Sequence, residues 1–258
     1  MIDQTAAFYD QLAADYHLVY TDWESSIRRQ AAALDRIIRD RLGATARRVL
    51  DCTCGIGTQS LGLAALGYDV AGTDLSSRAI QRARSEAARR NLEIRFQVAD
   101  LRTLALGPGE SFDVVFSADN SLPHLVDGSD LEAGIRRMVA HLRPGGLLVA
   151  SIRDYDAILE NPPRGTPPVV TGHPGDRRVT FQLWEWDTGH TTYQLELFVL
   201  REEPTGTWRT EVRRARYRAI RRSELTAIMK EQGLTSIQWL MREASGFFQP
   251  VVTAIGPG

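Results

Sequence analysis

Between residues 47 and 155, short apolar runs alternate with longer segments in which apolar positions recur at helical spacing. The apolar runs predict strands, and the periodic segments predict the helices between them. Such regular alternation is typical of a parallel, doubly wound sheet with helices on both faces. The expected strands are 47–51, 68–73, 94–98, 112–118 and 147–152, and the expected helices are 58–66, 76–90 and 130–142.

The two flanks of this region have other patterns. Residues 9–23 are dense in aromatic side chains without one apolar face, whereas residues 24–42 have helical spacing and end before Gly43. Beyond residue 155, a stretch rich in proline and glycine is expected to be a loop, and the runs after it predict an antiparallel insertion. The loop is 161–175, the runs are 179–187, 192–201 and 208–220, and a capped helix over 223–232 with strands 236–241 and 248–255 completes the sheet.

The expected fold is therefore α/β: a doubly wound, mostly parallel, seven-stranded Rossmann-like sheet with an antiparallel β insertion. We expect residues 1–45 to form an aromatic lid and a helix, and residues 46–258 to form one domain with 160–220 as its loop and insertion. With 258 residues, 43% of them hydrophobic, the chain can bury one large core with a small addition.

Composition excludes several classes of function. The formal net charge is -1, so no overall field attracts nucleic acid or a membrane surface. No run approaches the roughly 18 apolar residues of a membrane span, and the N-terminus lacks the features of a signal peptide. The two cysteines, Cys52 and Cys54, predict free thiols in a reducing cytoplasm rather than a zinc site, which needs about four ligands. We expect a cytoplasmic protein without a metal.

The most informative stretch is 49–59, VLDCTCGIGTQ, in which an apolar run ends at Asp51 and a turn on Gly55 and Gly57 precedes a helix. Glycines at such a turn allow a close approach of a nucleotide-like ligand. A dinucleotide fingerprint would need glycine where the chain has Ser60. The Asp51 carboxylate would also repel a pyrophosphate, whereas it would attract an ammonium group.

Two further carboxylates follow the next expected strands. Asp74 can accept hydrogen bonds from both hydroxyls of a ribose, and Asp100 with Leu101 can pair and pack an amine-bearing base. A ligand with a ribose, a base and an amino-acid tail but no phosphate is S-adenosylmethionine. The alternative is that these aspartates only cap strand ends or form Asx turns. Their occurrence on three successive strand ends, with GIG between them, favours the ligand.

The segments VLDCTCGIGT, GTDLS, VADL and LRPGGLL resemble the motif series of class I S-adenosylmethionine-dependent methyltransferases, over roughly residues 45–155. The resemblance implies an enzyme, a transferase that uses S-adenosyl-L-methionine and releases S-adenosyl-L-homocysteine. It also implies a set of cofactor-binding residues along these motifs. They are Asp51, Thr53, Gly55, Gly57, Asp74, Leu75, Asp100, Leu101 and Ala118.

A narrower resemblance connects DNSLPHL (119–125) and the segment 143–159 with glycine/sarcosine N-methyltransferases and their bacterial small-molecule relatives. It implies that Asn120 and Arg153 contact the acceptor, with Arg153 binding a carboxylate. It also implies that the N-terminal stretch ends at a cofactor-closing arginine, Arg28. The expected substrate-binding residues are Asn120, Arg153, Tyr155 and Trp184, and the expected catalytic residues are His124 and Asn120.

The chain departs from this narrower pattern at the turn residues Thr53 and Cys54. It also has Trp184 and Trp186 in the insertion, which an amino-acid pocket does not require. Enzymes that methylate flat nitrogen heterocycles, of the azapteridine type, are therefore a competing resemblance. Three further classes of function stay open: an O-methyltransferase of a secondary metabolite, an RNA or protein methyltransferase, and a non-catalytic cofactor-binding module.

Aromatic and titratable side chains extend these expectations. We expect Tyr16, Tyr20 and Trp23 to close over the sulfonium cation, which aromatic faces favour; the alternative is that they are core for the first helix. His124 is the candidate proton acceptor, because the ordinary pKa of histidine lies near neutrality; the alternative is a packing role.

The basic run 213–222 predicts either a solvated edge strand or, as the weaker alternative, a surface for RNA or an acidic substrate. We expect a small-molecule partner, no nucleic acid and no membrane. The antiparallel insertion could serve a homo-oligomer interface.

Overall fold

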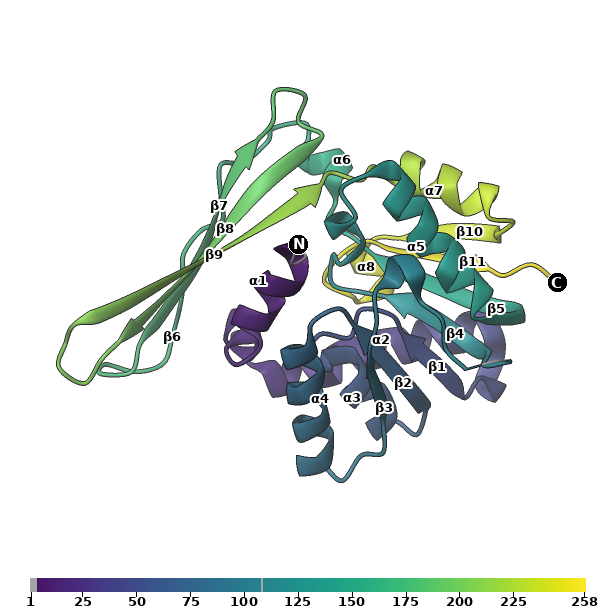
Figure 1. The fold of residues 1–258 in the computed structure, drawn as a ribbon, viewed down its shortest axis with the longest axis horizontal. Coiled ribbons are helices and arrows are strands. Elements are labelled where there is room, and N and C mark those ends of the chain that lie inside the picture. Colours follow the sequence, from purple (N-terminus) through teal and green to yellow (C-terminus); the bar gives the residue numbers. More distant parts are fainter. Residues whose placement is uncertain (1–3, 108) are drawn as a thin grey trace.

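The computed structural model describes residues 4–107 and 109–258. It contains a seven-stranded sheet and a separate four-stranded sheet that extends away from it (Figure 1). The strand order of the larger sheet is β10-β11-β5-β4-β1-β2-β3, with β11 antiparallel to both of its neighbours and the other pairs parallel. Its strands are β1 (Arg48–Asp51), β2 (Asp69–Asp74), β3 (Arg95–Val98), β4 (Phe112–Ser117), β5 (Leu142–Ser151), β10 (Thr235–Leu240) and β11 (Val251–Ile255).

Helices cover both faces of this sheet because successive strand residues point to opposite sides. Val49 of β1 and Val114 of β4 belong to one hydrophobic cluster with Leu34 and Ile38 of α2 (Trp23–Leu42). Leu50 of β1 belongs to a second cluster on the opposite face, with Ile135 of α5 (Gly128–Ala140) and Met229 of α7 (Arg222–Glu231). The α-helices are α1 (Gln4–Leu12), α2 (Trp23–Leu42), α3 (Thr58–Ala65), α4 (Ser77–Arg89), α5 (Gly128–Ala140), α6 (Tyr155–Ile158), α7 (Arg222–Glu231) and α8 (Arg242–Ser245), and the 3-10 turns are η1 (Tyr16–Val19), η2 (Gly43–Thr45), η3 (Leu101–Thr103) and η4 (Leu122–His124).

The expected α/β architecture is confirmed, including its seven strands and its antiparallel insertion. The helix expected over 24–42 is α2, whose first turn is capped by Asp22, and Ser76 caps α4 through the backbone N–H of Ala79. In the described part of the chain, no helix is long and apolar enough to cross a membrane.

Three details of the expectation were wrong. The loop 161–175 contains a short strand, β6 (Val169–Thr171), because these residues pair with β7 (Arg178–Trp186). β5 begins at Leu142, which pairs with Phe112, so the sequence RPGG lies inside the strand. α7 has no side-chain cap of its own, and Asp156 instead accepts a hydrogen bond from the backbone N–H of Arg222.

The four-stranded sheet has the order β6-β7-β8-β9, with β7 (Arg178–Trp186), β8 (Thr192–Glu202) and β9 (Trp208–Arg218). One face turns towards α1, which lies between this sheet and α4 (Figure 1). The basic run 213–222 alternates between the two faces of β9: Arg213 is only 6% exposed and shares the inner face with Tyr217, whereas Arg214 and Arg216 are exposed. β9 is an edge strand, and charged side chains on an edge discourage pairing with other chains.

Candidate active site

The glycine turn after β1 is fixed by a carboxylate at the end of β2. Gly55 and Gly57 have φ angles of 52° and 93°, a region that glycine enters without strain. The backbone N–H of Gly55 donates to Oδ2 of Asp74 at 2.8 Å, and the N–H of Ser76 donates to Oδ1 at 2.8 Å. A Cβ at Gly55 would lie 3.3 Å from the ring of Tyr16, so the aromatic segment approaches the turn closely.

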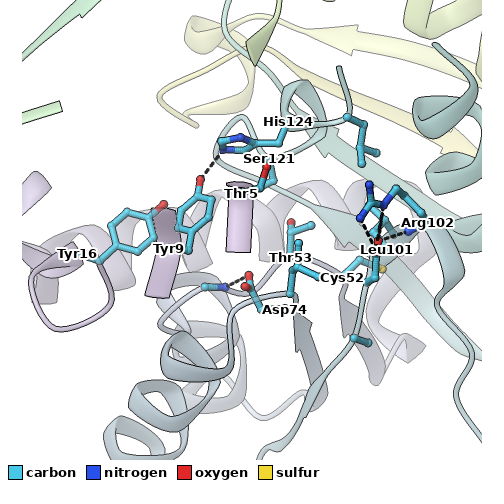
Figure 2. Close-up of a pocket in the computed structure, with 15 residues that line it drawn as sticks. Thr5, Tyr9, Tyr16, Cys52, Thr53, Asp74, Leu101, Arg102, Ser121 and His124 are labelled. Carbon is cyan, nitrogen blue, oxygen red and sulfur yellow. Dashed lines mark hydrogen bonds and ion pairs between the residues drawn. The ribbon is translucent and has the colours of Figure 1, made fainter. Parts of the chain in front are cut away.

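A first cavity opens at the carboxyl ends of β1, β2 and β3, which is where ligands bind in open α/β sheets (Figure 2). Its remaining walls come from α1, from η1 and from the segment after β4. It is lined by Thr5, Tyr9, Tyr16, Cys52, Thr53, Gly55, Asp74, Leu75, Ala99, Asp100, Leu101, Arg102, Ser121, His124 and Leu125.

The charges of this cavity fit a nucleoside without phosphate. Burial raises the pKa of Asp74, and two backbone N–H groups hold its carboxylate. Asp100 accepts hydrogen bonds from the backbone and the guanidinium of Arg102, the latter at 2.6–2.9 Å. Arg102 is the one cation among the described lining residues, and it is engaged by Asp100 and Asp130. A pyrophosphate would therefore meet carboxylates, whereas a ribose meets the acceptors that it needs.

Asp51 lies behind the turn rather than in the cavity wall. Its side chain is buried, with the residue 1% exposed, and it accepts hydrogen bonds from the hydroxyl of Ser60 at 2.7 Å and from the N–H of Thr53 at 3.3 Å. Burial raises the pKa of Asp51 to about 7. In this arrangement the Asp51 carboxylate anchors the turn. Its contact with the ammonium group of a bound cofactor stays a prediction.

The N-terminal aromatic side chains occupy different places. Tyr16 lines the cavity, and the hydroxyl of Tyr20 donates to Oδ2 of Asp119 at 2.8 Å. Trp23 is buried at the start of α2, where its ring N–H donates to Thr58 Oγ1 at 2.9 Å. Arg28 is exposed on α2 and does not line the cavity. The lid prediction therefore applies best to Tyr16, while the surroundings of Trp23 are those of a core residue.

A second cavity adjoins the first and shares Tyr9 and Tyr16 with it. It lies between α1, the ends of β4 and β5, and the inner face of the four-stranded sheet. Its lining is aromatic and aliphatic apart from a few polar groups. The lining residues are Phe8, Tyr9, Leu12, Tyr16, Val19, Asp119, Asn120, Arg153, Gln182, Leu195, Leu197, Tyr217 and Gln249.

Arg153 is held in this cavity by aromatic side chains of the insertion. Its guanidinium carbon lies 4.6 Å from the ring centroid of Trp184 and 5.5 Å from that of Tyr217. Its terminal nitrogens donate to the hydroxyl of Tyr193 at 2.6 Å and to Oε1 of Gln182 at 3.2 Å. Cation–π contacts and charge-assisted hydrogen bonds together fix the guanidinium plane.

Tyr9 stands at the junction of the two cavities. Its hydroxyl lies 2.8 Å from Nε2 of His124, and the ring of His124 lies 4.1 Å from that of Tyr217, centroid to centroid. His124 thus faces the first cavity (Figure 2). Its contact with Tyr217 also brings it to a wall of the second cavity. Burial raises the pKa of Tyr9 well above its usual value, so this hydroxyl is neutral at pH 7.

The structure brings most of the expected residues to these two cavities. Tyr155 and Trp184 lie behind Arg153, and Gly57 and Ala118 lie in the turns rather than in the described walls. Sequence reasoning missed Cys52, Tyr9 and Asp119 as lining residues. No group of three or more potential metal ligands occurs in residues 4–107 and 109–258. The expected residues that line the first cavity are Tyr16, Thr53, Gly55, Asp74, Leu75, Asp100, Leu101 and His124, and those that line the second are Tyr16, Asn120 and Arg153.

Known proteins share both the domain and the fold. Residues 49–146 match the family model described as a methyltransferase domain. A glycine/sarcosine N-methyltransferase of Parasynechococcus marenigrum (strain WH8102) is 31% identical over 139 residues, which are 54% of this chain and 48% of that relative. A dTDP-3-amino-3,6-dideoxy-alpha-D-glucopyranose N,N-dimethyltransferase of Streptomyces fradiae is 31% identical over 144 residues, which are 56% of this chain and 54% of that relative. The chain thus spans about half the length of these two relatives.

The fold extends further than these sequence matches. DesVI of Streptomyces venezuelae superposes with a TM-score of 0.81 at 21% identity, over 95% of this chain and 98% of that one. At this identity the likeness establishes the fold alone. It includes nearly the whole chain, so the insertion belongs to the shared architecture.

Proposed function

Because this chain belongs to the class I S-adenosylmethionine-dependent methyltransferases, we propose that it transfers the methyl group of that cofactor to a nitrogen of a small-molecule acceptor. The observation that carries the proposal is the pair of cavities that share Tyr9 and Tyr16. One cavity suits a nucleoside that has no phosphate, and the other suits a small organic molecule. The reacting atoms would meet between the two tyrosines.

The protein contributes position and exclusion of water rather than covalent chemistry. When bound, S-adenosylmethionine supplies an electrophilic methyl group on a positively charged sulfur. Asp74 would bind the ribose hydroxyls, Leu101 would pack against the base, and the partly buried rings of Tyr9 and Tyr16 would border the methyl group. Aromatic faces favour a nearby sulfonium by about 0.5–2 kcal/mol when water is excluded.

We propose a chemical class for the acceptor, an amine, rather than one compound. The relatives named above act, by their names, on glycine or sarcosine and on an amino sugar, and both supply a nitrogen. Arg153 faces the second cavity and is suited to a carboxylate. Trp184 contacts Arg153 and Gln182 and is not in the described wall of that cavity, so a stacked heterocycle is the weaker proposal.

The proposal is tested by incubating the protein with S-adenosylmethionine and parallel acceptors. Sarcosine, a nucleotide-linked amino sugar, an azapteridine and a metabolite extract would be supplied separately, and products would be identified by mass and fragmentation. We expect the mass of one methyl group to appear on a nitrogen. Methylation of oxygen alone, or transfer to none of these acceptors, would contradict the proposal.

His124 is proposed as the proton acceptor, acting through the Tyr9 hydroxyl that it contacts. A positioned base contributes about 10²-fold or more when proton removal limits the rate. We therefore expect His124→Ala to lower kcat by about 10²-fold and to remove the acid limb of the pH profile. His190 is exposed, and His190→Ala should leave both kcat and the pH profile unchanged. A variant profile of unaltered shape would leave His124 as a packing partner of Tyr9 and Tyr217.

A further inference from the structure

Asp119 places a carboxylate in the second cavity that the proposed chemistry does not yet use. It follows β4 in a left-handed conformation, with φ of 58°, and Asn120 follows with φ of 61°. Aspartate and asparagine tolerate this region better than most residues. The backbone N–H of Asp119 donates to Oγ of Ser151 at 2.8 Å, and the N–H of Asn120 donates to the Ser151 carbonyl at 3.2 Å. The end of β5 therefore fixes the direction of the side chain.

The Asp119 carboxylate has one protein hydrogen-bond donor in the described chain, the Tyr20 hydroxyl, which binds Oδ2. No lysine, arginine or histidine in residues 4–107 and 109–258 forms an ion pair with it within 4.0 Å. Arg153 acts on it only at longer range, since the guanidinium is directed to Tyr193 and Gln182. The other oxygen of Asp119, Oδ1, is therefore the one to which Tyr20 does not donate.

The surroundings of Asp119 favour a cationic ligand. Burial raises the pKa of this carboxyl to about 6, so it is mostly ionised at pH 7 in a poorly solvated site. An ionised carboxylate in such a site is stabilised by an opposite charge. Aromatic rings around it add to the attraction for a cation. The titratable and charged groups that face it are Tyr9, Tyr16, Tyr20, Arg153 and Tyr217.

The rest of the cavity wall is apolar. Phe8 and Leu12 of α1 and Val19 of η1 form one side, and Leu195 and Leu197 of β8 form the other. An acceptor as small as glycine would leave most of this wall without a contact. Apolar side chains contribute to affinity when they cover apolar ligand surface, about 25 cal/mol for each Å² removed from water.

We propose that Asp119 binds the ammonium group of the acceptor and that the acceptor is an amine with an apolar body. The inference deepens the proposed function and rests on it, because it assigns the second cavity to the acceptor. It makes Asp119 a specificity-determining residue: the carboxylate selects the amine, and the wall of α1 and β8 selects the apolar part. Arg153 then discriminates among such amines by the presence of a carboxylate.

Binding of two matched probes tests the inference. The affinities of 2-phenylethylamine and of its uncharged counterpart 2-phenylethanol would be measured by calorimetry, with S-adenosylhomocysteine at saturation. We expect the native protein to bind the amine about tenfold or more tightly than the alcohol, the size of a charge-assisted hydrogen bond. Asp119→Asn, which keeps the shape and tolerates the backbone conformation, should remove this preference. Asp127→Asn, an exposed aspartate before α5, should keep it.

Two further measurements keep the result interpretable. Binding of S-adenosylhomocysteine to Asp119→Asn reports whether the variant is folded. In the native protein, amine affinity should fall as the pH is lowered through about 6, while alcohol affinity stays constant. Equal binding of amine and alcohol to the native protein, or an unchanged preference in Asp119→Asn, would overturn the inference. Amine selectivity without methyl transfer to any acceptor would contradict the proposed function but not the assignment of Asp119.

Discussion

Asp74→Ala is expected to weaken S-adenosylhomocysteine binding by about 100-fold or more. The carboxylate has two tasks at the end of β2, since it holds the N–H groups of Gly55 and Ser76 and would accept hydrogen bonds from the ribose hydroxyls. Hydrogen bonds to a charged group contribute about 1.5–3 kcal/mol each, and a loss of about 2.7 kcal/mol corresponds to about 100-fold in affinity. Calorimetric titration measures the change directly.

Asp69→Ala is the matched control for this prediction. Asp69 begins the same strand, is exposed, and lies 3.6 Å from Arg48, at the opposite end of β2 from the cavity. Surface ion pairs contribute about 0–1 kcal/mol, so cofactor affinity should be unchanged in this variant. If Asp74→Ala bound S-adenosylhomocysteine within about twofold of the native protein, Asp74 would be a structural residue of the turn and the position of the nucleoside would need revision.

Arg153→Ala is expected to lower kcat/KM for a carboxylate-bearing amine by about 100-fold or more, and to change it little for an amine without a carboxylate. A substrate carboxylate placed beside this guanidinium would be buried, and removing one partner of a buried pair costs about 3–5 kcal/mol. An amine that lacks the carboxylate makes no such pair. Steady-state kinetics with L-phenylalanine and 2-phenylethylamine separate the two cases.

Arg214→Ala controls for the loss of an arginine from the same region of the molecule. Arg214 is exposed on the outer face of β9, where it pairs with Glu196. The Arg214→Ala variant should therefore keep the native kcat/KM for both amines. Because Arg153 also packs between Trp184 and Tyr217, its removal could loosen the insertion. An equal loss for both amines would assign Arg153 to packing, and the carboxylate role would then be wrong.

The fold was largely predictable because most strands of the larger sheet contain a short apolar run between polar segments. β4, buried at every position, and the turn at Gly55 are clear in the sequence without any tertiary information. The strand β6 could not be predicted, because Val169–Thr171 lies among prolines and glycines and becomes a strand only by pairing with β7 in the folded protein. The absent side-chain cap of α7 has the same origin, since Asp156 supplies the acceptor from another element.

The site was predictable where strand ends determine it and less so where distant segments meet. Asp74 and Asp100 line the first cavity because carboxyl ends of parallel strands share one edge. The pattern could not indicate that Asp51 turns inward to Ser60. Asp119 was missed because its environment depends on Tyr20, which is 99 positions away. The signal that could have found it is the Asp-Asn pair directly after a buried strand, a composition that favours left-handed backbone.

The most direct test of the central claim is a crystal structure of the protein with S-adenosylhomocysteine bound. The account predicts the ribose at Asp74, the base beside Leu101, and the sulfur directed towards Tyr9 and Tyr16, where the second cavity begins. A nucleoside bound elsewhere, or a sulfur directed away from Asp119 and Arg153, would contradict it.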